Sequence, residues 1–417
     1  MSSFRAALRL PGDVWRLELA VFVNFLGTGL VLPFELIYLH NLRGFSFALT
    51  GLIGAVMSGL GIFFTPLAGV LIDRLGPRAL MIGSFTSMAC GYALFPTIHA
   101  PWQGFLCAAL IGVGNGTFRS GETALFITYV PREHRHLAFV TRRMLVNLGI
   151  GLGGIVAGLV VVSSSAATFT AIFLGDAASF VVVVALLAQV PPRPPLVESL
   201  DGEPVTKSYR LVFGDRTFCT FVALNTMLMV VGYGVAQSLG AVYAKNFAHA
   251  SPHVVGLLIT VNAFFIVVAQ IPIGGRLERR RRMLVLATTG ALWSAASLLF
   301  WSASFGFSFV TTVFLLLAAE TVIALGECLH GAVATPLVAD LVNPAFVGRY
   351  VAVSSLAFQA AMAIGPAAGG ALLEWSAGAL WLPAAAVAAL ASVAALRFER
   401  RLPAHARTSL AGLGQPV

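Results

Sequence analysis

The stretch G-V-L-I-D-R-L-G-P-R, from Gly69 to Arg78, places two glycines, a proline and three charged residues between two long apolar runs. A second stretch, G-G-R-L-E-R-R-R-R from Gly274 to Arg282, repeats a glycine, an acid four residues later and an arginine directly after the acid. A spacing of 205 residues relates the two, and it also carries Gly121-Glu122 onto Gly326-Glu327. Two matches at one spacing predict a duplicated unit.

The composition around these stretches is that of a polytopic membrane protein. Of 417 residues, 58% are apolar and only 10% are charged, and the mean hydropathy is +0.89. A soluble domain carries about 25% charged residues, so a soluble enzyme, a nucleic-acid-binding protein and a disordered chain are excluded. The apolar runs are continuous and do not alternate with period two, which favours helices over a β-barrel. The expected class is an all-α membrane protein.

Reading apolar runs between charged and turn-forming clusters predicts twelve transmembrane helices in two pseudo-symmetric six-helix bundles. A proline-rich and charged stretch, residues 191–210, separates residues 1–190 from residues 211–400, and residues 401–417 form a tail. The expected helices span residues 17–40, 46–72, 79–99, 102–130, 138–162, 168–190, 211–246, 251–275, 283–303, 306–339, 347–373 and 378–398.

The distribution of positive charge predicts the orientation of these helices. With both termini cytoplasmic, the outer loops hold only Arg43 and Lys245, and Arg119 lies within a span. The other 23 of the 26 Lys and Arg residues fall in inner loops, tails or adjoining helix ends. Such a bias agrees with the positive-inside rule. We expect a multi-pass protein of the bacterial inner membrane with both termini inside.

The Gly69–Arg78 stretch resembles the signature of the major facilitator superfamily, G-x-x-x-D-R-x-G-x-R, between the second and third helices. The resemblance implies two six-helix bundles around a central cavity that opens alternately to either side. It implies a gating motif whose charges pair across the two halves in one state only, with Asp73 facing the start of the eleventh helix. The residues are Gly69, Asp73, Arg74, Gly76 and Arg78, with Glu278 and Arg279 from the second copy.

Charged residues within the spans are candidates for proton coupling, because each costs about 2.5 to 3.5 kcal/mol at membrane depth. Arg119 and Glu122 lie three residues apart in G-N-G-T-F-R-S-G-E, which resembles the superfamily's fourth-helix pattern, and we expect them to pair. A static structural pair is the alternative. Glu320, Glu327 and His330 share a face of the tenth helix, and Glu327 repeats Glu122.

Two further acids are weaker candidates. Glu35 ends the run N-F-L-G-T-G-L-V-L-P-F-E, which resembles the first helix of drug–proton antiporters, although a solvated position at the cavity mouth is an alternative. Asp176 in the sixth helix is expected to bond to a neighbouring helix. Residues expected to line the cavity are Phe22, Phe25, Phe34, Tyr38, Asn147, Tyr233, Gln237 and Gln359.

The antiporter resemblance is incomplete. Drug antiporters of the superfamily carry G-x-x-x-G-P-x-x-G-G in the fifth helix, whereas here that helix has glycines without the proline. The G-P-x-x-G-G core occurs instead in the eleventh helix, at Gly365 to Gly370. Generic close packing is therefore as good an explanation of these glycines as an antiport-specific hinge.

These observations predict a secondary transporter, a proton-coupled antiporter for multidrug efflux of amphipathic compounds. An importer or facilitator of a metabolite, a lipid or lysolipid transporter, and a transporter-like receptor are the alternatives. The expected partners are a small-molecule substrate, protons and membrane lipids, with no nucleic acid, and the expected state is a monomer. The proton gradient supplies the energy, because G-x-x-x-x-G-K-[ST] is absent. No other cofactor, no metal and no enzyme activity are expected.

Overall fold

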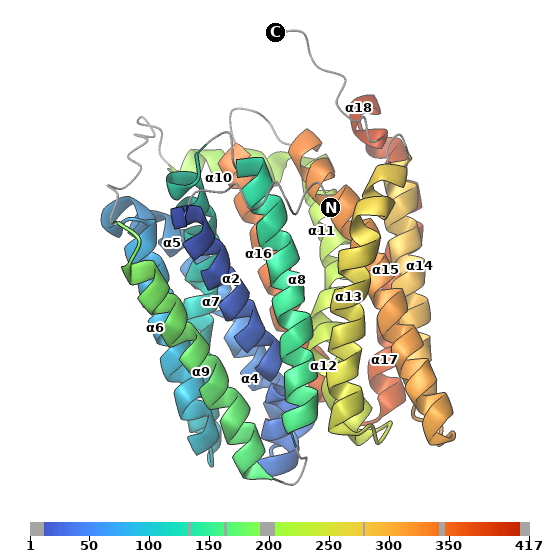
Figure 1. Ribbon diagram of the computed structural model, residues 1–417. Coiled ribbons are helices and arrows are strands. Elements are labelled where there is room, and N and C mark those ends of the chain that lie inside the picture. Colours follow the sequence, from blue (N-terminus) through green and yellow to red (C-terminus); the bar gives the residue numbers. More distant parts are fainter. Residues whose placement is uncertain are drawn as a thin grey trace.

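The computed structural model describes residues 12–131, 135–161, 165–191, 205–277, 280–341 and 347–408. Helices make up nearly all of these residues (Figure 1), and one isolated bridge joins Arg281 to Thr408. The observed architecture confirms the expected all-α membrane fold of the major facilitator type. Helix bounds agree with the expected spans to within a few residues at most ends.

The first six spans form the bundle at the left of Figure 1, which we call the N-bundle. Its helices run alternately up and down and are connected by short loops. They are α2 (Gly12–Val31) with α3 (Glu35–Ile37) and η1 (Tyr38–Leu42), α4 (Phe47–Gly59) with α5 (Gly61–Leu75), α6 (Pro77–Leu94) with η2 (Phe95–Thr97), α7 (Pro101–Tyr129), α8 (Arg135–Val160) and α9 (Ala166–Ala188).

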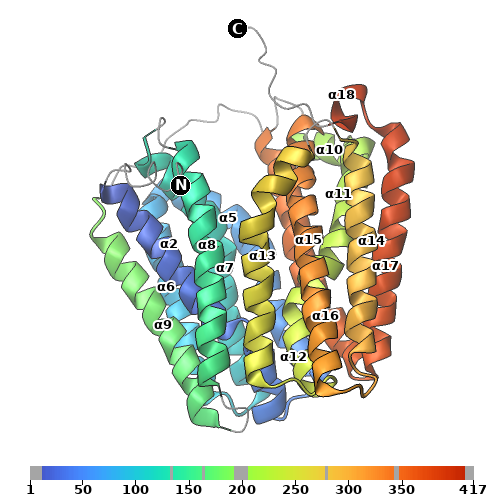
Figure 2. The ribbon, with the colours of Figure 1, turned by 45° about the vertical axis from the view of Figure 1, so that its right-hand side comes forward.

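The second six spans form the C-bundle, at the right of Figure 2. They follow α10 (Val205–Gly214), a helix that begins inside the stretch expected to be a linker; residues 192–204 of that stretch lie outside the described residues. The spans are α11 (Arg216–Met229) with η4 (Val230–Gln237) and α12 (Ser238–Asn246), α13 (Pro252–Arg276), α14 (Arg282–Ser302), α15 (Phe309–Leu341), α16 (Val347–Leu373) and α17 (Ala377–Phe398); η6 (Glu399–Arg401) and α18 (Ala404–Arg407) end the described chain.

Eleven helices in the described chain are long and apolar enough to cross a membrane, and α7 is the one expected span missing from that set. It has 29 residues and packs against α4, α5 and α6 within the N-bundle. Its hydropathy is low because Asn115, Thr117, Arg119 and Glu122 interrupt the apolar run. Helix α7 therefore combines the length of a membrane span with a polar face, a combination associated with function.

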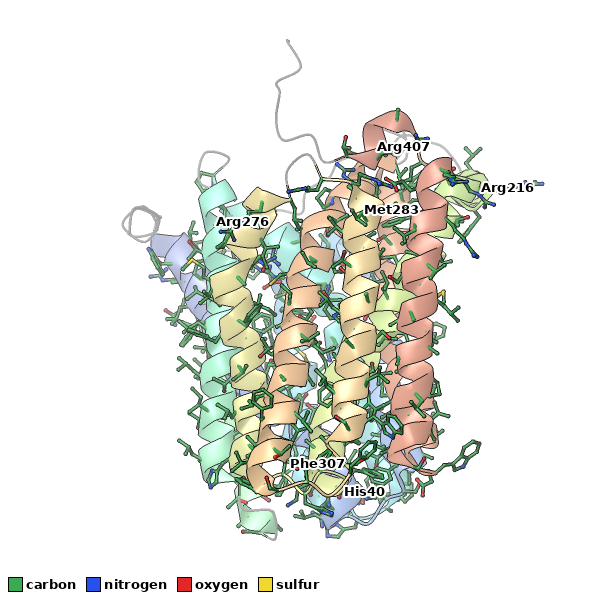
Figure 3. The ribbon with its side chains drawn as sticks, turned by 90° about the vertical axis from the view of Figure 1, so that its right-hand side faces the viewer. His40, Arg216, Arg276, Met283, Phe307 and Arg407 are labelled. Carbon is green, nitrogen blue, oxygen red and sulfur yellow. The ribbon has the colours of Figure 1, made fainter. Side chains whose placement is uncertain are left out.

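The two ends of the bundles differ in charge. Figure 3 places Arg216, Arg276 and Arg407 at one end of the molecule, which we call the basic face. His40 and Phe307 lie at the other end, the opposite face. The start of α2 and the end of α17 both lie at the basic face (Figure 1), as an even number of spans requires.

Side-chain contacts repeat at the 205-residue spacing. The hydroxyl of Tyr38 donates to the carbonyl oxygen of Pro96 at 2.9 Å. The equivalent Tyr243 donates to the carbonyls of Phe300 and Trp301, and Trp301 is the equivalent of Pro96. Both tyrosines are fully buried, where an unpaired hydroxyl would be costly. The duplicated sequence therefore encodes the same interaction in each bundle.

The two bundles meet near the opposite face. Asn41 and Asn246, again 205 residues apart, exchange side-chain hydrogen bonds of 2.6 and 3.1 Å across the contact. Such a pairing of equivalent residues is what a two-fold relation between the halves produces. Figure 2 shows α8 and α13 side by side toward this face and diverging toward the basic face.

Glycines allow the bundles to touch backbone to backbone at this seam. A Cβ on Gly51 of α4 would lie 2.1 Å from the carbonyl oxygen of Pro366 in α16. A Cβ on Gly256 of α13 would lie 2.6 Å from the carbonyl oxygen of Gly154 in α8. Real Cβ atoms do not approach so closely, so these two contacts require glycine. The structure is closed at the opposite face.

Candidate functional site

The predicted gating stretch forms the turn between α5 and α6. Gly76 has φ +80°, a conformation that glycine adopts without strain, and Pro77 begins α6. Arg78 donates through Nε to the carbonyl oxygen of Leu187 at 2.9 Å and through Nη2 to that of Ala188 at 2.8 Å. These carbonyls end α9, where a cation is favourable.

In this state both acceptors of Arg78 belong to its own bundle, and the pairing across the two halves, expected in one state only, stays a prediction. Arg74 is exposed at the end of α5. The burial of Gly69 and the side chain of Asp73 are outside what the structure describes, and Glu278 and Arg279 lie outside the described residues. The gating role of the motif stays a prediction.

Glu122 of α7 pairs with Arg142 of α8 and not with Arg119, which corrects the expected pairing. The carboxylate oxygen Oε2 of Glu122 accepts from Nη2 of Arg142 in a short salt bridge. Glu122 is 3% exposed, and its second oxygen has no hydrogen-bond partner. Spacing of three residues places Arg119 and Glu122 on adjacent parts of α7, but Arg119 extends to α16 of the other bundle.

Glu18 of α2 completes this cluster and was missed by sequence reasoning. It is 0% exposed, neither of its carboxylate oxygens has a hydrogen-bond partner, and Arg142 and Glu122 are its charged neighbours. Glu18 lies at the start of the expected first helix, residues 17–40, and was not among the candidate residues. In the structure α2 begins at Gly12, which carries Glu18 into the membrane-spanning part.

A second acidic cluster lies in the C-bundle. Oε1 of Glu327 accepts from Nε2 of Gln237 at 3.1 Å and from Nδ2 of Asn262 at 3.4 Å. Glu320, two turns earlier on α15, is a charged neighbour of Glu327 and also interacts with Asn262. Gln237, expected to line the cavity, thus contacts an acid as well. Amide donors rather than cations surround this pair of carboxyl groups.

His330 extends the same face of α15. Its Nε2 lies 2.8 Å from Oδ1 of Asn225, and its Nδ1 lies 3.5 Å from the hydroxyl of Tyr233. The ring of Tyr233 packs edge-on against buried Trp293, with centroids 5.6 Å apart, and lies 5.8 Å from the ring of Phe358. Tyr233 therefore connects the buried polar cluster to the helix that faces Arg119.

Glu35 and Asp176 belong to the interior of the N-bundle. Glu35 accepts a 2.6 Å hydrogen bond from the hydroxyl of Tyr92 in α6. Asp176 is fully buried and accepts from Ser179 of its own helix at 3.2 Å. It lies against Gly27 of α2, because a Cβ there would be 2.2 Å from its Oδ1. The expected bond from Asp176 to another helix is replaced by this packing contact.

The expected cavity residues divide into two groups. Phe34 and Tyr38 are wrong as wall residues, because both are buried in an aromatic core with Phe169, whose ring lies 6.1 and 5.6 Å from theirs. These positions follow Pro33, where the helix changes course toward the packed interior. The others are half-buried: Phe22, Phe25, Asn147, Tyr233, Gln237 and Gln359.

Two arginines of the N-bundle reach toward the C-bundle. Cζ of Arg119 lies 4.4 Å from the ring centroid of Phe358 in α16. Nη2 of Arg143 lies 3.8 Å from the point that a Cβ on Gly331 in α15 would occupy. Both arginines are exposed, and both are electrostatic neighbours of Tyr233. We call the region bounded by Arg119, Arg143, Tyr233 and Phe358 the central space.

In the described chain no three His, Cys, Asp or Glu residues are placed to hold a metal ion. The groups that the structure brings together are carboxyl groups, guanidinium groups and aromatic rings.

Comparison with known proteins agrees with this geometry. The family model described as Major Facilitator Superfamily matches residues 17–243 and 217–416. The chain is 24% identical over 365 residues to the uncharacterized MFS-type transporter YqjV of Bacillus subtilis, covering 86% of each chain. It is 24% identical over 263 residues to the quinolone resistance protein NorA of Staphylococcus aureus, covering 62% of this chain and 65% of that one.

Another relative is the multidrug resistance protein MdtH of Klebsiella pneumoniae, 26% identical over 233 residues, which cover 56% of this chain and 55% of MdtH. Among solved structures, the nucleoside transporter NupG superposes with a TM-score of 0.71 over 94% of this chain and 99% of NupG at 16% identity. A D-xylose-proton symporter gives a TM-score of 0.72 over 93% of this chain and 98% of that chain, also at 16% identity. The chain is a transporter and not an enzyme, and it belongs to the major facilitator superfamily.

Proposed function

We propose that this protein is a proton-coupled exporter of amphipathic, drug-like small molecules that works by alternating access. The similarity to a quinolone resistance protein and a multidrug resistance protein supports the substrate class. Helices that meet at the opposite face and diverge toward the basic face support alternating access, since the same bundles can pivot to close the other side.

The observation that carries proton coupling is the cluster of two buried acids around one arginine. Glu122 is bonded to Arg142, whereas neither carboxylate oxygen of Glu18 has a hydrogen-bond partner, so an ionised Glu18 would be a buried charge with no bonded partner. A proton bound to Glu18 removes that cost. Such a cluster is a proton-binding site whose occupancy depends on whether water reaches it.

The position of the cluster links proton binding to the substrate. Glu122 lies one helical turn from Arg119, which borders the central space, and Arg142 precedes Arg143, which borders it too. A substrate that displaces Arg119 or Arg143 changes the field at Glu122 and Glu18. Protonation of Glu122 in turn weakens its bond to Arg142 and frees α8 to move against α7.

Orientation follows from the positive-inside rule. The basic face is assigned to the cytoplasm, and both termini with it, in the inner membrane of a bacterium. The state described is then open to the cytoplasm, where an exporter takes up its substrate. A monomer suffices for this mechanism, because the seam and the central space lie within one chain.

The test is substrate-driven proton movement in proteoliposomes, with a panel of amphipathic drugs and a pH-sensitive dye inside the vesicles. Wild-type protein is expected to move protons when substrate is added. Glu122→Gln and Glu18→Gln are expected to bind substrate without moving protons. Arg216→Gln, a change of one exposed charge at the outer edge of the basic face (Figure 3), is the control and is expected to behave like wild type.

Substrate transport without proton movement in any of these proteins would contradict the coupling and make the protein a facilitator. Transport and proton movement unchanged in the Glu18→Gln and Glu122→Gln double variant would show that the acids around Arg142 are structural. Binding assays on the same preparations separate a loss of coupling from a loss of substrate.

A further inference from the structure

The exposed charges at membrane depth all have one sign in the described chain. Arg119 and Arg143 are exposed within their helices, whereas Glu18, Glu122, Asp176, Glu320 and Glu327 are buried. Glu35 is half-buried and bonded to Tyr92. A solute that enters between the bundles therefore meets two guanidinium groups and no exposed carboxylate.

Both guanidinium groups belong to the same region. Arg119 lies ten residues before the end of α7 and Arg143 eight residues after the start of α8, which puts both about 12 to 15 Å from the basic face. Each contacts the other bundle, Arg119 at Phe358 and Arg143 beside Gly331. Exposure to lipid would cost each several kcal/mol, so their orientation toward the central space is the favourable one.

Neither arginine forms a salt bridge with a carboxylate among the described residues. The salt bridges among the described residues join Arg142 to Glu122, Arg281 to Glu399 and Arg282 to Asp340. Glu327, the acid of the opposing bundle closest in sequence to Gly331, is held by two amide groups. Among the described residues, Arg119 and Arg143 therefore form no salt bridge; Glu122, the charged neighbour of Arg119, is bonded to Arg142.

The surroundings of the two cations are aromatic. The ring of Phe358 lies under the guanidinium of Arg119, and the ring of Tyr233 lies 5.8 Å from that of Phe358. Phe25 and Phe118 form another half-buried pair in the N-bundle, with centroids 6.2 Å apart. A guanidinium stacked on a ring keeps its in-plane N–H groups free to bind an anionic oxygen.

From these contacts we infer that the central space selects amphipathic molecules with an anionic group, such as a carboxylate, phenolate or sulfonate, bound by Arg119 and Arg143. The inference rests on the proposed function for transport but concerns binding alone. The apolar part of the molecule lies against Phe358 and Tyr233. The anionic group lies beside Arg143 near Gly331, where the side-chain amide of Gln270 is a second donor 3.6 Å from the point that a Cβ on Gly331 would occupy.

The experiment measures binding to purified wild-type protein in detergent, with no proton gradient. Its probes are three fluorescent ligands on one scaffold: anionic dansylglycine, neutral dansylglycinamide and cationic dansylethylenediamine. Dansylglycine is expected to bind at least about tenfold tighter than the other two, the factor associated with one charge-assisted hydrogen bond, and to lose affinity as salt rises.

Arg119→Gln and Arg143→Gln are each expected to weaken the binding of dansylglycine by about tenfold and to leave the binding of dansylglycinamide unchanged. Arg119→Lys and Arg143→Lys keep the charge and are expected to bind better than the Gln variants. Arg216→Gln is the control, because Figure 3 shows Arg216 at the outer edge of the basic face. Thermal unfolding of each variant verifies that it is folded.

Equal affinity for the three probes, or unchanged dansylglycine binding in both folded Gln variants, would overturn the inference. Proton-coupled export of a cationic substrate at the same rate in the Arg119→Gln and Arg143→Gln variants would also overturn the inference, while leaving the proposed function intact. Arginine-dependent anion binding without proton movement would support the inference and refute the coupling.

Discussion

Alanine at Gly51 should open the seam at the opposite face. The Cβ would lie 2.1 Å from the carbonyl oxygen of Pro366 and 3.0 Å from Cα of Gly370, so α4 and α16 must separate by about 1 Å to reach ordinary van der Waals contact. Overpacking of this kind costs about 1 to 3 kcal/mol. The contact joins the two bundles, so that cost falls on the state that is closed at this face.

A cost of that size shifts the ratio of the two states by about 5- to 150-fold toward the state open at the opposite face. Distances between spin labels at the opposite-face ends of α4 and α16, measured by pulsed electron resonance, report the shift. Gly83→Ala is the control, because a Cβ there meets nothing within 4 Å. Identical distance distributions for Gly51→Ala and Gly83→Ala would refute the seam as a state-specific contact.

Three further predictions follow from single contacts. Gly234→Ala should destabilise the C-bundle in every state, because its Cβ would lie 2.4 Å from the carbonyl of Ala361 within that bundle. The midpoint temperature of thermal unfolding is expected to be well below that of Gly83→Ala, and equal midpoints would contradict this packing. Arg142→Gln leaves two buried acids without a cation and should lower thermal stability, whereas the double variant Arg142→Gln/Glu122→Gln should recover part of the loss; no recovery would argue against the pair. Arg78→Gln removes two charged hydrogen bonds from the end of α9, at about 1 to 3 kcal/mol in all; hydrogen exchange near Leu187 should accelerate, and unchanged exchange would refute the cap.

The spans were predictable because membrane helices are encoded in long, uninterrupted stretches of sequence. Even α7, whose polar residues lower its hydropathy, was recognised from its length and from the charge distribution in the flanking loops. The 205-residue repeat was visible in two motifs, and the structure extends it to contacts that spacing alone does not reveal. The exchange between Asn41 and Asn246 is one, since it depends on how two copies meet.

The partners of charged side chains were less predictable. Spacing along α7 suggested that Arg119 binds Glu122, yet each side chain finds its partner on a different helix, Phe358 for one and Arg142 for the other. Local spacing identifies which residues share a face but not which helix packs against that face. Glu18 was missed for the same reason, because its charged neighbours, Arg142 and Glu122, lie on other helices.

For the aromatic residues, the error was to expect buried side chains at the cavity wall. Phe34 and Tyr38 were expected to line the cavity, but after the turn at residues 32–34 they lie in the core of the N-bundle. Tyr233, expected from the equivalent helix, does border the central space. The two equivalent helices therefore differ in which face carries their aromatic side chains, and the apolar sequence alone does not distinguish them.

Uphill transport tests proton-coupled export most directly. Proteoliposomes with an acidic lumen, in a neutral buffer with permanently charged and neutral amphipathic probes, should accumulate substrate above its external concentration as protons leave. Protein-free vesicles give the baseline. The account predicts accumulation with wild-type protein, its collapse on adding a protonophore, and none with Glu122→Gln. Equilibration without accumulation in wild-type vesicles, or accumulation that persists in Glu122→Gln, would contradict it.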